Sequence, residues 1–136
     1  FTMGAHSTWH AILTNELPEN AMDDVKSSIA AVTRETGSPC QTFAYPNGNY
    51  NALLGQHAMK CGVKTAVTTE PLWADSLFPP WRLPRIQIHN FYTADRIALK
   101  IMAAIPGFIL NNPDGTGRRY VIERFQRLLR SPAIQL

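Results

Sequence analysis

Hydrophobic positions in the first third of the chain recur at helical spacing. Apolar side chains follow one another at intervals of three or four residues, at Met22, Val25, Ile29 and Val32. This spacing places them along one face of a helix and predicts that helix over about residues 18–35. Gly37 follows directly, and a glycine in the left-handed conformation commonly ends a helix.

Further along, short apolar runs alternate with helical patterns. The apolar runs predict the end of a strand at Phe1–Ala5 and further strands over Gln41–Tyr45, Lys64–Thr69 and Leu83–His89. Between and after them, helices are predicted over Asn51–Cys61 and Ala94–Ile105, with Thr93 capping the second. Strands that alternate with helices favour βαβ units, a parallel sheet and the α/β class.

The end of the chain has a different character. Asn111–Gly117 is rich in turn-forming residues, and Arg118–Arg130 has the pattern of an amphipathic helix. We therefore expect a main part over residues 1–110. Residues 111–136 are expected to form a linker and a basic carboxyl-terminal helix of the same domain.

Composition narrows the class of protein. With 136 residues, 45% of them hydrophobic and 17% charged, the chain is typical of one globular domain. It is short for a complete α/β barrel, which needs about 200 residues or more. No apolar run approaches the roughly 18 residues that predict a transmembrane segment. Cys40 and Cys61 lack zinc-finger spacing and are expected to be small buried side chains, although an oxidising compartment would allow a disulfide.

The net charge of +3 arises at the end of the chain, where residues 111–136 hold five arginines and two acidic residues. A basic tail can bind acidic polymers, so nucleic acid or an anionic surface is one hypothesis for a partner. The arginines also fit the exposed side of a single helix, and no nucleic-acid-binding motif accompanies them. We therefore expect no nucleic-acid partner.

Polar residues follow the predicted strands at the point where each strand ends. They are His6, Pro46-Asn47-Gly48, Thr69-Glu70 and His89-Asn90. Ligands of parallel α/β folds bind at the carboxyl ends of the strands. A functional site is therefore expected where these residues gather on one rim.

His6 and His10 form a candidate metal site. They stand four residues apart in a connection between a strand and a helix. If the connection has helical turn geometry, both rings project to one side and can share a divalent ion. Catalytic metal sites usually take a third protein ligand, often a carboxylate, and leave a position open for water.

Three segments in this order resemble the polysaccharide deacetylase family (NodB-homology domain, carbohydrate esterase family 4). They are Gly4-Ala5-His6-Ser7-Thr8-Trp9-His10, then Phe43-Ala44-Tyr45-Pro46-Asn47-Gly48-Asn49-Tyr50, and finally Ala66-Val67-Thr68-Thr69 with Leu83-Pro84-Arg85. The likeness covers roughly residues 3–90 and is to the carboxyl-terminal part of that domain. It implies a partial (β/α) barrel of the NodB-homology type with parallel strands. It also implies metal-dependent removal of acetyl groups from amino sugars or acetylated glycans.

The resemblance also implies roles for particular residues. His6 and His10 would be ligands of a divalent metal, which we expect to be zinc, and the N–H of Asn47 would help to hold the oxyanion. Arg85 would replace the arginine that the family has where this chain has Ala44, and His89 would protonate the leaving group. His89 is also interpretable as an ordinary polar residue at a strand end.

The aspartate pair that supplies the family's base and third metal ligand is not found before the histidines. Asp23-Asp24 follows them on the polar side of the first helix, where we interpret both as solvated charges. This chain alone is therefore expected to be inactive. The alternative to an incomplete deacetylase is a non-catalytic glycan-binding pseudoenzyme domain.

Aromatic residues accompany the rim segments and are candidates for stacking on sugar rings, at Tyr45, Tyr50, Trp73 and Trp81. Each of them can equally be a packing residue. An acetylated glycan is the expected substrate. An incomplete barrel would expose sheet edges, so a homo-oligomer or a missing amino-terminal segment is expected to cover them. The family implies the cell envelope, the periplasm or secretion.

Overall fold

The computed structural model describes residues 2–74 and 78–104. These residues divide into two compact units, the first within Phe1–Glu70 and Ala74–Arg85, the second within Pro71–Trp73 and Ile86–Leu136. The linker and helix predicted within residues 111–136 lie outside the described residues.

A small parallel sheet organises the first unit. Its strands are β1 (Thr42–Ala44) and β2 (Thr65–Val67), which pair in parallel with Phe43 opposite Ala66. Isolated parallel bridges extend the sheet on both sides, because Ala5 pairs with Phe43 and Leu83 pairs with Val67. Four chain segments therefore run side by side in the same direction, in the order in which they occur along the chain.

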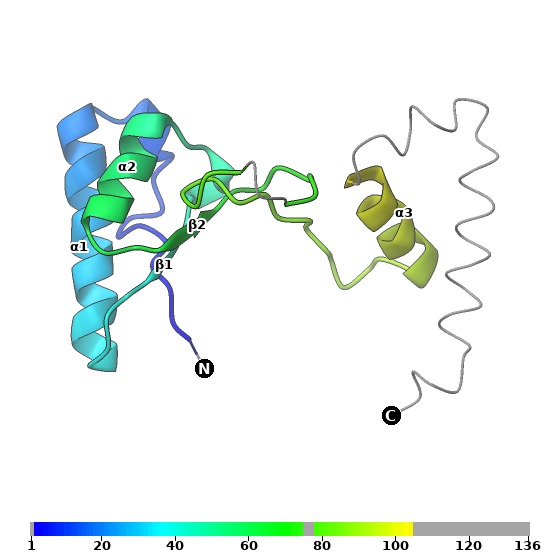
Figure 1. Cartoon of the computed structure of the whole chain (residues 1–136), viewed down its shortest axis with the longest axis horizontal. Coiled ribbons are helices and arrows are strands. Elements are labelled where there is room, and N and C mark those ends of the chain that lie inside the picture. The colour runs from blue at the N-terminus through cyan, green and yellow to red at the C-terminus, as the bar shows by residue number, and fades with distance from the viewer. Residues whose placement is uncertain (1, 75–77, 105–136) are drawn as a thin grey trace. The chain divides into compact units, whose positions relative to one another are not determined.

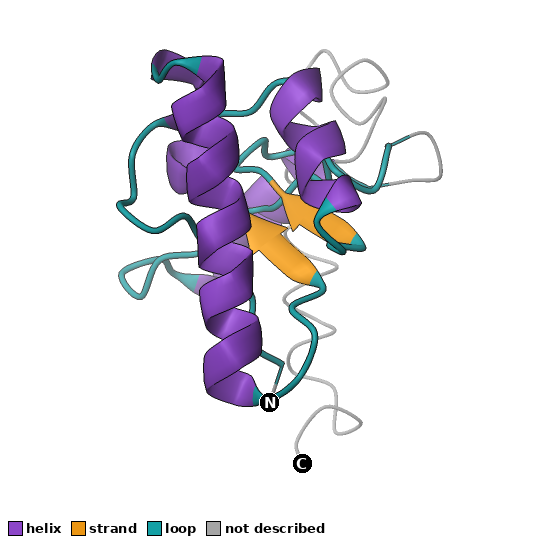
Figure 2. Cartoon of the chain, turned by 90° about the vertical axis from the view of Figure 1, so that its left-hand side faces the viewer, coloured by secondary structure: helices purple, strands orange, loops and turns teal. Residues whose placement is uncertain are grey.

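The helices α1 (Pro18–Thr36) and α2 (Ala52–Lys60) connect these segments. They pack against each other and lie on one face of the strands (Figure 1, Figure 2). Right-handed crossovers between neighbouring parallel strands place successive helices on the same face. The α/β arrangement with parallel strands that the sequence predicts is thus confirmed for this unit.

Local signals end and begin these helices where the sequence predicts. Gly37 ends α1 in the left-handed conformation, with φ of 65°, which costs a glycine little. The side chain of Asn51 accepts a hydrogen bond from the backbone N–H of Leu54, at 2.9 Å, and so caps the start of α2. Short 3-10 turns, Leu13–Asn15 (η1) and Pro46–Gly48 (η2), stand before α1 and after β1.

The core of the first unit lies between the helices and the strands. Each strand contributes its middle residue, Phe43 or Ala66, and α1 contributes Val25 and Ile29. Phe43, Val25 and Ala66 are almost fully buried, as the apolar periodicity predicts.

The predicted strand over Leu83–His89 is wrong beyond its first residue. Only Leu83 pairs with β2. Pro84 has no N–H to donate to a neighbouring strand, and the N–H of Arg85 donates to the carbonyl of Glu70 instead, at 3.0 Å. Because the sheet of the described residues has two strands, a closed barrel is not established.

The second unit contains α3 (Ala94–Ala104), close to the helix predicted from Thr93 onward. The hydroxyl of Thr93 accepts a hydrogen bond from the N–H of Arg96, at 3.4 Å. The N–H of Trp73 donates to the carbonyl of Ala104 at the other end of the helix, at 2.9 Å. Across the part of the chain that the structure describes, no helix is long and apolar enough to cross a membrane.

Candidate functional site

The residues that follow the parallel segments of the first unit gather on one rim, as predicted. His6 follows the bridge residue Ala5, and its Nδ1 lies 2.7 Å from the carbonyl oxygen of Ala44 at the end of β1. The hydroxyl of Thr69, just past β2, donates to the carbonyl of Asn47 at 3.1 Å. His89-Asn90 belongs to the second unit, so its place on this rim stays a prediction.

The loop from His6 to His10 brings the two imidazole rings together. Their centroids are 4.8 Å apart and the rings meet edge to face, at 73°. The route is different from the helical turn that we expected, because Ser7 and His10 both have positive φ, of 68° and 55°. The expected proximity of the rings is present, but an irregular loop with two left-handed residues produces it.

The hydrogen bond of His6 suits a metal ligand. The carbonyl of Ala44 can only accept, so the contact at Nδ1 requires the tautomer that carries its proton there. Nε2 then has a free lone pair, and a backbone carbonyl on the other nitrogen is the usual way to orient a metal-binding histidine. Both rings are solvent-exposed. The two residues therefore fit two positions of a zinc site.

A third ligand is not found in the same place. Among the described residues, no group of three His, Cys, Asp or Glu side chains is arranged to hold a metal ion. Within residues 2–74 and 78–104, the donor set at this rim is thus the histidine pair alone.

Asp24 on α1 corrects the interpretation of Asp23-Asp24 as two solvated charges. The Asp24 carboxylate accepts hydrogen bonds from the backbone N–H of Thr8, at 2.7 Å, and from that of Trp9, at 3.4 Å. It also accepts one from the hydroxyl of Ser7, at 3.3 Å. Asp23 is exposed, as expected, whereas Asp24 is half-buried against the histidine loop.

The turn after β1 presents a backbone donor to the rim. Asn47 has φ of 55° and Gly48 has φ of 80°. Gly48 N–H donates to the carbonyl of Tyr45 and Asn49 N–H to that of Pro46. Within the described residues the N–H of Asn47 has no such acceptor, which is what an oxyanion donor requires.

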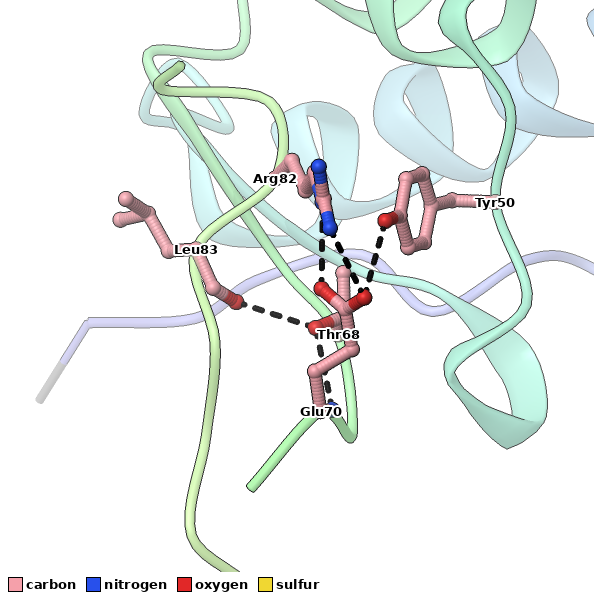
Figure 3. A network of polar contacts seen from close by, with 5 residues as sticks. All are labelled: Tyr50, Thr68, Glu70, Arg82 and Leu83. Atoms are coloured by element: carbon pink, nitrogen blue, oxygen red, sulfur yellow. Dashed lines mark hydrogen bonds and ion pairs between the residues drawn. The ribbon is translucent and has the colours of Figure 1, made fainter. Parts of the chain in front are cut away.

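An ion pair that the sequence analysis missed lies beside this turn (Figure 3). Arg82 donates two hydrogen bonds to the carboxylate of Glu70, from Nε at 3.1 Å and from Nη2 at 3.0 Å. The hydroxyl of Tyr50 donates to the same carboxylate at 3.1 Å. The hydrogen bond from Arg82 holds the pKa of Glu70 below its usual value, against partial burial. Burial and the bond to Glu70 raise the pKa of Tyr50.

Arg85, which we predicted to supply a charge at the site, is exposed. Arg82 is the arginine that pairs with a rim carboxylate. The two stand three residues apart on either side of Leu83-Pro84. The sequence carries no signal that separates them, because the pairing depends on where the chain turns after Pro80.

The four aromatic candidates for sugar stacking lie in different surroundings. Tyr45 is fully buried, with its hydroxyl donating to the carbonyl of Trp81 at 2.8 Å, and so offers no ring face to a ligand. Trp81 packs against Gly55 on α2, and Tyr50 is engaged with Glu70. Tyr45 is therefore a packing residue, whereas Tyr50 and Trp81 are half-buried and their role in sugar binding stays a prediction.

Two tryptophans do present exposed rings. Trp73, in the second unit, is 48% exposed, and its role in sugar binding stays a prediction. Trp9 was not among the candidates, yet it is 83% exposed and stands next to His10 in the histidine loop. Its position inside the His6–His10 motif was the signal that could have identified it.

His89 and His57 are the remaining histidines, and neither belongs to the histidine loop. His89 is exposed in the second unit and stacks on Phe91, with centroids 5.2 Å apart. His57 on α2 lies 3.6 Å from the sulfur of Cys61 through its Nε2. Cys40 is buried and Cys61 is half-buried, and both are free thiols.

A model of the polysaccharide deacetylase family matches residues 1–66, which include the histidine loop and β1. Residues 1–66 are thus similar to polysaccharide deacetylases. The predicted resemblance is thereby confirmed for the segment that carries both histidines.

Solved structures of deacetylases resemble the chain over a longer stretch. The deacetylase PplD of Streptococcus pyogenes, solved in complex with acetate, is 23% identical, with a TM-score of 0.65 over 72% of this chain. A polysaccharide deacetylase from Bacillus cereus is 25% identical, with a TM-score of 0.63 over 74% of this chain. The comparison with curated protein sequences gave no match.

The chain spans less than half of these deacetylases, 43% of the length of PplD and 32% of that of the Bacillus cereus protein. The likeness to PplD concerns the fold.

Proposed function

We propose that this chain contributes two metal-binding histidines and an oxyanion donor to a metal-dependent deacetylase of acetylated polysaccharides or amino sugars. The observation that supports this proposal best is the histidine pair at the rim, because the ring centroids of His6 and His10 lie 4.8 Å apart in a segment that matches the deacetylase family model. A bound zinc ion would polarise the acetyl carbonyl and lower the pKa of a coordinated water.

The chain's own residues would act around that ion as binding and orienting groups. His6 keeps its Nδ1 proton on the carbonyl of Ala44, so that Nε2 stays available as a ligand. The N–H of Asn47 would donate to the oxygen of the acetyl group as negative charge develops there. Its left-handed conformation is supported by the bond from Thr69 to the Asn47 carbonyl.

A second candidate function follows from the donor set. Within the described residues no carboxylate joins the two histidines, which favours a non-catalytic glycan-binding domain if none is supplied by preceding sequence. The two proposals differ in one measurable property, because only the enzyme releases acetate.

The test compares the 136-residue chain with the same chain preceded by the sequence that its gene encodes before Phe1. Zinc content and acetate release from an acetylated chitooligosaccharide are measured for both. His6→Ala and His10→Ala are made in each, and His57→Ala serves as a control that removes an imidazole from α2 instead.

The deacetylase proposal expects zinc binding and acetate release in the longer protein, with loss of both in His6→Ala and His10→Ala and retention in His57→Ala. Acetate release that survives both rim substitutions would refute the proposed role of the histidines. Glycan binding without acetate release in the longer protein would favour the pseudoenzyme.

A further inference from the structure

The histidine loop is held by a residue from outside its own sequence motif. Asp24 lies 14 residues after His10, on the second turn of α1. Its carboxylate accepts from the two consecutive backbone N–H groups of Thr8 and Trp9. Its main-chain carbonyl accepts from the hydroxyl of Thr8, at 3.4 Å. One residue of the helix therefore contacts the middle of the loop at several points.

The carboxylate of Asp24 also contacts Ser7, whose side chain binds the backbone at the end of the loop. Ser7 donates its hydroxyl proton to Asp24, and its oxygen accepts from the backbone N–H of His10 at 2.9 Å. A hydroxyl group can donate one hydrogen bond and accept another at the same time. The contact to Asp24 thus orients the Ser7 oxygen toward His10.

The loop needs this support because its backbone is unfavourable. Ser7 and His10 have positive φ without being glycines, and such residues persist only where surrounding contacts enforce them. The contacts that could do so in the described structure are those of Asp24, the Ser7 bond and the bond between His6 and Ala44. Hydrogen bonds to an ionised carboxylate are the strongest of these.

We infer that Asp24 is the positioning residue of the histidine loop: its carboxylate fixes the backbone of Thr8 and Trp9 so that His6 and His10 present their rings together to a metal ion. Asp24 acts on the loop and is not itself a ligand. The inference rests on the proposed function in so far as it concerns metal binding. It also makes a claim about the loop that holds without any metal.

The variant Asp24→Ala removes the carboxylate, and Asp23→Ala is its matched control. Asp23 is the neighbouring residue, carries the same charge and is exposed. A general electrostatic effect of α1 would appear in both variants. Asp24→Asn keeps the size of the side chain and one carbonyl oxygen for Thr8, but places an amide group where the second oxygen was. It is therefore expected to lie between wild type and Asp24→Ala.

Two measurements are made on the protein with its preceding sequence. Zinc affinity, by competition with a chelator, is expected to fall about 10- to 100-fold in Asp24→Ala, as for other residues that orient metal ligands. It is expected to fall less in Asp24→Asn and to be unchanged in Asp23→Ala. Amide hydrogen exchange without metal is expected to accelerate at Thr8 and Trp9 in Asp24→Ala, with Val25 and Ile29 unchanged.

The outcomes separate this inference from the proposed function. Zinc binding that depends on His6 and His10 but is equal in Asp24→Ala and wild type would overturn the inference and leave the function intact. Accelerated exchange throughout α1 would overturn it as well, because Asp24 would then stabilise the helix and not the loop.

Absence of zinc binding in the wild type would refute the proposed function. In that case unchanged exchange at Thr8 and Trp9 would refute the positioning role, and faster exchange confined to them would support it.

Discussion

The close approach of Gly48 to the end of β2 makes a prediction about how the rim is assembled. Gly48 is buried, with φ of 80°, in the turn that carries Asn47. A Cβ at this position would lie 2.6 Å from the backbone nitrogen of Thr69 and would overlap its hydroxyl oxygen. The variant Gly48→Ala therefore meets two obstacles, one in the backbone and one in the contact with Thr69.

The two costs can be estimated separately. A left-handed conformation costs a residue with a Cβ about 1–2 kcal/mol. Forcing one methyl group into a closely packed site costs about 1–3 kcal/mol more. Gly48→Ala is thus expected to lower the free energy of unfolding by roughly 2–5 kcal/mol.

Gly37 provides the matched control. It also has positive φ, of 65°, but a Cβ there would have nothing within 4 Å. Gly37→Ala should therefore lose only the backbone contribution of about 1–2 kcal/mol. Urea denaturation followed by far-ultraviolet circular dichroism compares the two variants. Equal losses would refute the close packing of the turn against Thr69.

Three further outcomes are expected. Trp9→Ala should weaken binding of an acetylated oligosaccharide, measured by calorimetry, roughly 5- to 25-fold, which is equivalent to about 1–2 kcal/mol of stacking. The control Leu53→Ala shortens another exposed apolar side chain and should leave the affinity unchanged. Equal effects of the two substitutions would contradict a role for the Trp9 ring. Glu70→Gln should destabilise the protein at neutral pH, because it breaks the pair with Arg82. Since the pKa of Glu70 is lowered in the folded state, that stabilisation is present above the unfolded-state pKa of about 4.3 and is lost as the pH falls through the folded-state value. Urea midpoints of wild type and Glu70→Gln should therefore converge in acid, and a gap that stays constant from pH 7 to pH 3 would exclude the ion pair as its source.

Much of the first unit could be predicted because its signals are local. The apolar spacing around Val25 and Ile29, the glycine after α1 and the asparagine before α2 each act within a few residues of where they stand. Parallel pairing of β1 with β2 follows from the helix between them. The prediction of a strand after Leu83 was wrong because the apolar pattern alone does not show which backbone N–H groups can donate, and Pro84 has none.

In the candidate site, too, local features could be predicted and contacts between distant residues could not. The histidine pair could be found, because both histidines lie in one short segment with recognisable spacing. Arg82 and the buried state of Tyr45 could not, since each depends on contacts with residues at least 12 positions away in the sequence, Glu70 and Trp81. Aromatic composition near a rim therefore says little about which rings are open to a ligand.

Asp24 shows why the histidine motif is not enough to define the proposed metal site. The motif specifies two imidazoles, but their relation in space depends on a backbone that the motif does not make favourable, with left-handed residues at Ser7 and His10. The carboxylate of Asp24 on α1 supplies the missing constraint through the backbone N–H groups of Thr8 and Trp9, between the two histidines. It follows that a chain can keep both histidines and still lose the site through a substitution on α1. Comparing metal affinities among chains that share the histidine spacing should therefore sort them by the residue at the position of Asp24 as well as by the motif itself.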